Sequence, residues 1–206
     1  MNLGLPAFWS GVTILLLGTA TQAQEKVEQR PQPRQAIQDY LSSLDGVRLG
    51  KRLQLQTLQS DDLRKIFDRC EFLVLRYPRY PIEIVPVEPL RANNLFAVCD
   101  GKVIRISDDT DLKDFFLQRF PVSAKDEIRA AGVRGWLQLA QELHQDGFIK
   151  FGGPLVKPGG LQFEGAVNVT EGSGEGRLRV IMEFTNGRLS KLSFEGNVVP
   201  GTRQLR

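Results

Sequence analysis

The last third of the chain alternates apolar and polar residues with the period of two that is typical of β-strands. Loops marked by Gly, Pro or Asn separate four such segments, which begin at Phe148, Leu161, Arg177 and Arg188. The dipeptide "NG" at 186–187 is a two-residue hairpin turn signal between the last two segments. This alternation predicts an antiparallel sheet with one buried and one solvent-exposed face. The side chains expected on its buried face are Leu161, Phe163, Val167, Val169, Leu178, Val180, Met182, Phe184, Leu192 and Phe194.

Three earlier segments space their apolar residues as a helix does. The first runs from Gln35 to Leu44. The second starts after the N-cap residue type Ser60, carries two aspartates in its first turn, and is expected to reach Tyr77. The third and longest starts at Ser123 with a capping-box spacing and is expected to end at Gly147. Its polar side is expected to carry Arg129, Arg134, Gln138, Gln141 and Gln145.

The segment 93–107 has the clearest hairpin pattern of the chain. Asp100-Gly101 is a type I′ turn signal, and Leu95, Ala97 and Cys99 share one face of the strand before it. The aspartates that follow, at 108–114, lack the twelve-residue spacing of a calcium-binding EF-hand loop. They are better explained as caps of a helix, so no metal is expected there.

These elements predict the α+β class. N-terminal helices and a β-hairpin are followed by a long helix packed on a four-stranded antiparallel meander. This order resembles the general plan of cystatin-like and nuclear-transport-factor-like folds. The resemblance concerns the order of elements and transfers no site residues.

The N-terminus has the pattern of an exported protein. Residues 1–23 carry no charged side chain, contain the apolar run "GVTILLLG", and end in the small-x-small triplet "TQA". We expect 1–23 to be a cleaved signal peptide, 24–34 a flexible linker, and 35–206 a single domain made of parts 35–120 and 121–206. The expected location is secreted or periplasmic, with no membrane contact after cleavage. The alternative is an uncleaved membrane anchor, because the uncharged span has borderline length for crossing a bilayer.

The charge and the cysteine content of the chain indicate which partners and which cross-links to expect. The net charge of the 206-residue chain is +3, and its basic and acidic residues are interspersed. A nucleic-acid-binding protein usually has a basic stripe, so nucleic acid is not an expected partner. Cys70 and Cys99 are the only two cysteines of the chain. In an oxidising compartment they predict one disulfide, and the alternative is two buried thiols.

The sequence contains little that points to catalysis. His144 is the single histidine, and the carboxyl groups two residues away on either side lie on other faces of a helix. No Gly-x-Ser-x-Gly motif is present. The segment "GGPLVKPGG" at 152–160 lacks the phosphate-loop pattern and is expected to be a mobile hairpin loop. No catalytic, metal-binding or cofactor-binding residue is therefore assigned, and no cofactor is expected.

Two regions are candidates for contact with a ligand or a partner. In "LRYPRYPIEIVPVEPLR", at 75–91, Arg76, Tyr77, Arg79 and Tyr80 combine residue types that are enriched at interfaces. The prolines of the same stretch alternatively predict a stiff joint between two elements. Trp136 is expected to line a cleft between the long helix and the sheet.

The function predicted from these patterns is that of a small exported α+β protein, non-enzymatic, which binds an unknown small ligand or protein. One alternative is a secreted hydrolase with carboxyl groups of raised pKa in the cleft. Another is an interaction or inhibitor module without a pocket, recognisable by an exposed apolar patch.

Overall fold

The computed structural model describes residues 32–44, 54–76, 93–123, 125–145, 149–171 and 174–197. The expected signal peptide and most of the expected linker lie outside these ranges. The helices are α1 (Pro33–Ser43), α2 (Asp61–Ile66), α3 (Asp109–Arg119) and α4 (Asp126–His144). The strands are β1 (Gln54–Thr57), β2 (Cys70–Arg76), β3 (Asn93–Cys99), β4 (Lys102–Ile106), β5 (Ile149–Phe151), β6 (Leu155–Gly159), β7 (Gln162–Glu171), β8 (Gly174–Thr185) and β9 (Arg188–Asn197).

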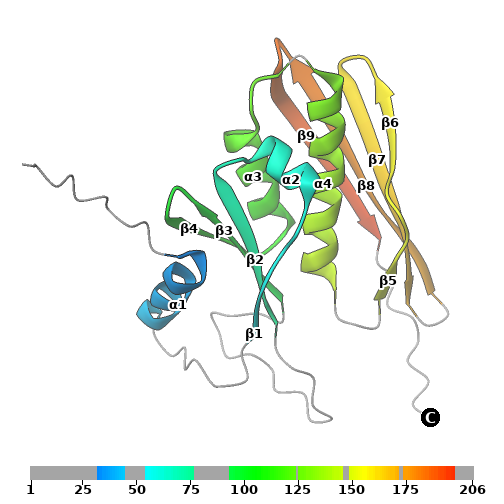
Figure 1. Ribbon diagram of the computed structural model, residues 1–206. Helices are drawn as coiled ribbons and strands as arrows, with labels where there is room; N and C mark the ends of the chain where they lie inside the picture. Colours follow the sequence, from blue (N-terminus) through cyan, green and yellow to red (C-terminus); the bar gives the residue numbers. More distant parts are fainter. Residues whose placement is uncertain are drawn as a thin grey trace, which may run out of the picture.

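The strands form two antiparallel sheets, with α4 lying between them (Figure 1). The N-terminal sheet has the order β1-β2-β3-β4. The C-terminal sheet has the order β5-β7-β8-β9, and β6 also pairs with β7. One hydrophobic core contains the inner faces of both sheets together with α2, α3 and α4. The predicted α+β class is confirmed.

The largest difference between the predicted and the observed structure is strand β2. The expected helix from Ser60 to Tyr77 ends at Ile66, and Cys70–Arg76 is a strand. Phe72 and Val74 face the main core, whereas Leu73 and Leu75 belong to a second cluster that α1 covers from the other side. A strand buried on both faces is a continuous apolar run, and its period alone does not distinguish it from a buried helix.

Local capping and turn signals were more reliable. The Ser60 hydroxyl accepts a hydrogen bond from the backbone N–H of Leu63 and caps α2 as predicted. The predicted hairpin is confirmed, and both turn residues, Asp100 and Gly101, have the positive φ angles of a type I′ turn. The Asp108 carboxylate accepts hydrogen bonds from two N–H groups of the first turn of α3.

Helix α4 differs from its prediction at both ends. It starts at Asp126 rather than Ser123, whose hydroxyl instead accepts a hydrogen bond from the N–H of Lys125. It ends at His144, and Gly147 lies outside the described residues. Because α4 is covered from both sides, Arg129 is buried rather than exposed, with its guanidinium 5.1 Å from the centre of the Phe184 ring. A Cβ atom at Gly132 would clash with the ring of Phe120, so a larger residue there would require this ring to move.

The C-terminal sheet contains five strands instead of the predicted four. The segment expected to begin at Phe148 corresponds to β5, and the loop expected after it contains a further strand, β6; both strands pair with β7. Most of the expected loop 152–160 is thus strand β6. Leu161, expected in the core, is 65% exposed because it lies in the turn between β6 and β7. The other predicted inner residues are buried or, for Phe194, partly buried against the core.

Candidate functional site

Trp136 is buried and not exposed to solvent. Its side chain is fully buried between the two sheets, and its ring lies 5.4 Å from that of Phe194. The neighbouring α4 residues Val133, Leu137 and Ala140 are also fully buried, so side chains fill the contact between α4 and the C-terminal sheet. The indole Nε1 is buried without a hydrogen-bond partner among the described residues. Trp136 is thus a core residue in this structure, and its predicted role in ligand contact stays a prediction.

The predicted disulfide between Cys70 and Cys99 is present. The two residues are direct partners in the β2–β3 register, with Cα atoms 4.1 Å apart. An ion pair between Arg69 and Asp100, 2.8 Å long, lies beside the bridge. The alternative of two buried thiols is wrong, and the chain has no free cysteine to serve as a nucleophile for His144.

The residues Arg76, Tyr77, Arg79 and Tyr80 are not brought together as a described surface. Arg76 is the last residue of β2 and pairs with Gln54 and Asn93 in the sheet register. It thus ends a strand and not a helix. The other three residues lie outside the described ranges, so their predicted role in partner contact stays a prediction.

His144 has a partner that its sequence neighbours did not reveal. Its Nε2 lies 2.8 Å from a carboxylate oxygen of Asp109, at the start of α3. Both side chains are partly buried, with 29% and 19% of their surface exposed. The contact joins the end of α4 to the start of α3 across 35 residues of sequence, a separation that no helical spacing can indicate. The contact links the two helix ends directly.

The hydrolase alternative predicts carboxyl groups with raised pKa values. Among the described residues, the two carboxyl groups whose pKa values clearly depart from the ordinary ones both have lowered values, so these two groups do not support that alternative. A hydrogen bond from Lys65 lowers the pKa of Glu127, and a hydrogen bond from Arg179 lowers the pKa of Glu164. Within the described ranges, no group of three or more His, Cys, Asp or Glu side chains is placed to hold a metal ion.

A charged pair between α2 and α4 fixes the position of the short helix. Arg134 donates two hydrogen bonds to Asp62, from Nε at 2.9 Å and from Nη2 at 2.7 Å. The hydrogen bond to Asp62 raises the pKa of Arg134 above its ordinary value. Both side chains are about two-thirds or more buried, and a two-pronged contact of this kind is stronger than a single surface ion pair.

We expect Asp62→Asn to lower the free energy of unfolding by about 1 to 2 kcal/mol, because it removes a charge-assisted contact at a half-buried site. Asp61→Asn is the matched control. Asp61 lies in the same first turn, but its ion pair with Arg64 is mostly exposed. We therefore expect Asp61→Asn to lower the free energy of unfolding by less than about 0.5 kcal/mol. Urea unfolding of both variants measures the difference. Equal decreases in the unfolding free energy of the two variants would mean that the contact with Arg134 adds nothing to the interaction of a first-turn aspartate with the helix dipole.

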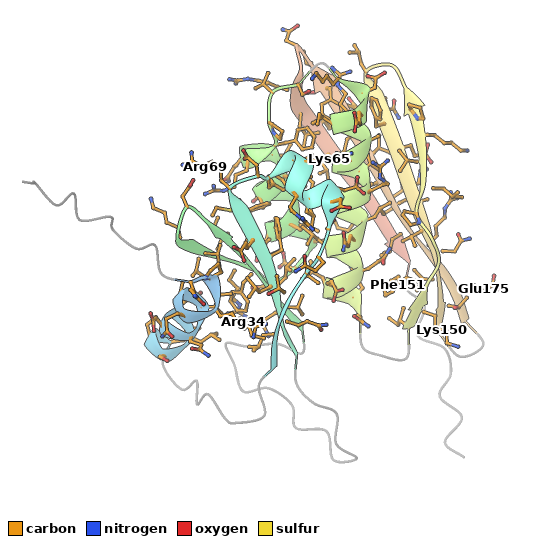
Figure 2. The ribbon with its side chains drawn as sticks, viewed as in Figure 1. Arg34, Lys65, Arg69, Lys150, Phe151 and Glu175 are labelled. Carbon is orange, nitrogen blue, oxygen red and sulfur yellow. A yellow bond between two sulfur atoms is a disulfide. The ribbon has the colours of Figure 1, made fainter. Side chains whose placement is uncertain are left out.

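One face of the C-terminal sheet is not covered by any of the described helices. In the sheet register, Leu155, Ala166, Arg179 and Glu195 form one row across the strands, and Lys157, Glu164, Ile181 and Ser193 form the next. Leu155 is 65% exposed, whereas Ala166 is buried. Figure 2 shows Lys150 and Glu175 near the end of the sheet where β5 lies. We call this surface the outer face.

Charges of both signs alternate on the outer face. Arg179 contacts Glu164 at 2.8 Å and Glu195 at 3.8 Å, and Lys191 contacts Glu183 at 2.9 Å. The exposed large apolar residues of the described chain do not form one patch there. Leu155 lies on the outer face, but Leu161 lies in the β6–β7 turn and Val122 between α3 and α4. The continuous apolar patch expected of a pocketless module is thus not seen on this face.

Comparisons of the chain with protein-family models, with curated proteins and with solved structures found no match. The similarity to cystatin-like and nuclear-transport-factor-like folds therefore remains one of element order. Within the described part of the chain, no helix has the length and apolar character needed to cross a membrane.

Proposed function

We propose that the chain is an exported, non-enzymatic domain that binds a protein partner through the outer face of its C-terminal sheet. The observation that carries this proposal is the contrast between the two sides of that sheet. The inner side is filled by α4, including the fully buried Trp136. The outer side is covered by none of the described helices.

The chemistry of the outer face favours a protein over the other partner classes. Exposed Leu155, the buried Ala166 next to it and the half-buried Ile181 provide apolar area between charged rows. Two of the basic side chains on this face, Arg179 and Lys191, are already paired with glutamates. A nucleic acid would require basic groups without such partners. A small ligand would require a concave site, whereas a protein can bind a flat face of mixed charge.

Two features support export. The first 23 residues have the pattern of a signal peptide, and Cys70 and Cys99 form a disulfide. Disulfides persist mainly in oxidising compartments such as the periplasm or the extracellular space. An intact mass of protein recovered from exporting cells tests this directly. A chain that starts at Gln24 supports export with cleavage, and a chain that retains residues 1–23 contradicts it.

We expect Leu155→Arg to reduce partner binding about tenfold or more, because it places a charge in the apolar part of the outer face. Leu161→Arg is the matched control, since Leu161 has the same residue type and the same 65% exposure but lies in a turn. A photoreactive residue at Asn168, an exposed outer-face position, captures the partner in the exported fraction for mass spectrometry.

The proposal requires one specific partner whose capture is lost in Leu155→Arg and kept in Leu161→Arg. Both variants must unfold at the urea concentration of the parent chain, so that the loss reflects binding. If capture fails at Asn168, or if both variants capture the partner equally, the outer face is not the binding surface.

A further inference from the structure

Strand β9 is an edge of the C-terminal sheet. It is ten residues long and pairs with β8 along one side, and no described strand pairs with its other side. An unpaired edge of this length presents N–H and C=O groups that can bind another strand. Proteins usually protect such edges by bulges and charges. In β9 a register irregularity lies near the β8–β9 turn, opposite Glu183 and Phe184, and leaves Lys191–Asn197 regular.

The central five residues of this edge, "KLSFE" at 191–195, have a symmetric chemistry. Lys191, Ser193 and Glu195 are exposed on the outer face. Leu192 and Phe194 point to the inner face, where Leu192 is buried and Phe194 is partly buried against Trp136. From Ser193 outward, the order is therefore apolar and then charged in both directions, with opposite charges at the two ends.

We propose that β9 pairs antiparallel with β9 of a second copy of this chain, about a two-fold axis through Ser193. In this register Lys191 lies opposite Glu195 of the second copy, and Glu195 lies opposite Lys191 of the second copy. Leu192 lies opposite Phe194 of the second copy on the inner face. Directly opposite residues of antiparallel strands share a face, so every contact joins groups of matching chemistry.

Other registers are less favourable. An axis through Lys191 places two lysines opposite each other, and an axis through Glu195 places two glutamates opposite each other. An axis through Leu192 or Phe194 places both Lys191 and Glu195 across from uncharged residues of the second copy. Among the five central residues, only the axis through Ser193 pairs each charge with its complement. Like charges directly opposite destabilise a strand pair, so this register is specified by the sequence.

The contacts within one copy extend this pattern. Lys191 already contacts Glu183, and Glu195 already contacts Arg179. Pairing about Ser193 therefore produces a row that crosses the junction as Glu183, Lys191, then Glu195 and Arg179 of the second copy. The signs alternate along the whole row. The edge lysine, which in isolation would discourage strand addition, becomes a specific contact for a second copy.

A charge-reversal cycle tests the pairing. Lys191→Glu and Glu195→Lys should each weaken self-association about tenfold or more, because each places like charges across the junction. The double variant restores opposite charges across the junction. Within each copy, however, it leaves residue 191 beside Glu183 and residue 195 beside Arg179 with like charges. Recovery in the double variant can therefore come only from contact between copies.

The measurement is sedimentation velocity of the full exported chain over a range of concentrations at low salt. The parent should form a species of twice the chain mass, and the double variant should recover to within about threefold of the parent affinity. Glu175→Lys, an exposed charge reversal on β8 away from the edge, should leave association unchanged. A parent that stays monomeric at high micromolar concentration, single variants that associate as the parent does, or a double variant no better than the single ones would each overturn the proposal.

This pairing is independent of the proposed partner contact, because it uses the β9 edge and not Leu155 or Asn168. Loss of the two-copy species in Lys191→Glu with partner capture at Asn168 intact would support the edge pairing alone. Loss of capture in Leu155→Arg with the two-copy species intact would support the outer-face contact alone.

Discussion

Breaking the Cys70–Cys99 bridge is expected to lower the free energy of unfolding by roughly 3 to 4 kcal/mol. The bridge joins residues 29 apart in sequence, and a cross-link of that span removes a large part of the conformational entropy of the unfolded chain. It also fixes the β2–β3 register at one end. Urea unfolding of the oxidised and the reduced parent chain measures the effect without any change of side chain.

The double variant Cys70→Ala/Cys99→Ala is the control for this experiment. It should unfold near the urea concentration of the reduced parent, with a small further loss because Cys99 is buried and contributes to the core. Identical unfolding of the oxidised and reduced parent would show that the bridge does not stabilise the fold. An intact mass without the loss of two hydrogens would show that it does not form.

Trp136→Ala is expected to lower the free energy of unfolding by about 3 to 5 kcal/mol, because it leaves a large cavity between the two sheets. Trp136→Phe should lower the free energy of unfolding much less. It keeps most of the buried ring, and it removes an indole N–H that is buried without a partner among the described residues, a group that itself costs about 1 to 3 kcal/mol. Urea unfolding followed by circular dichroism compares the two variants.

The fluorescence of Trp136 tests the same burial independently. The chain has two tryptophans, Trp9 and Trp136, so a protein cleaved after residue 23 contains Trp136 alone. We expect weak quenching by acrylamide in the folded state and strong quenching after unfolding. Strong quenching of the folded protein, or a stable Trp136→Ala variant, would mean that Trp136 lines an open site, and the ligand-binding alternative would then regain support.

The sequence determined those features that depend on neighbouring residues. The two-residue alternation places Val180, Met182 and Phe184 on the inner face of β8, as predicted. Asp100-Gly101 forms the expected turn, and Ser60 caps a helix through its own hydroxyl. These signals are reliable because a strand period, a positive φ angle or a capped N–H is satisfied within a few residues of sequence.

Only the tertiary structure decided which elements are covered on both sides. The run "FLVL" at 72–75 fits a helix and a buried strand equally well, and its strand conformation follows from the cover that α1 and the main core provide on opposite faces. Arg129 has the spacing of an exposed helix position, yet it is buried because both sides of α4 are covered.

The pairs His144–Asp109 and Arg134–Asp62 join residues 35 and 72 apart, and no local pattern indicates them. The candidate binding surface, like these pairs, is not indicated by any local sequence pattern. The outer face of the C-terminal sheet is defined by what does not cover it, which is a property of the packed chain. Local sequence sets the period, the caps and the turns, whereas burial and partner choice depend on contacts between distant segments, which form only when the chain has folded.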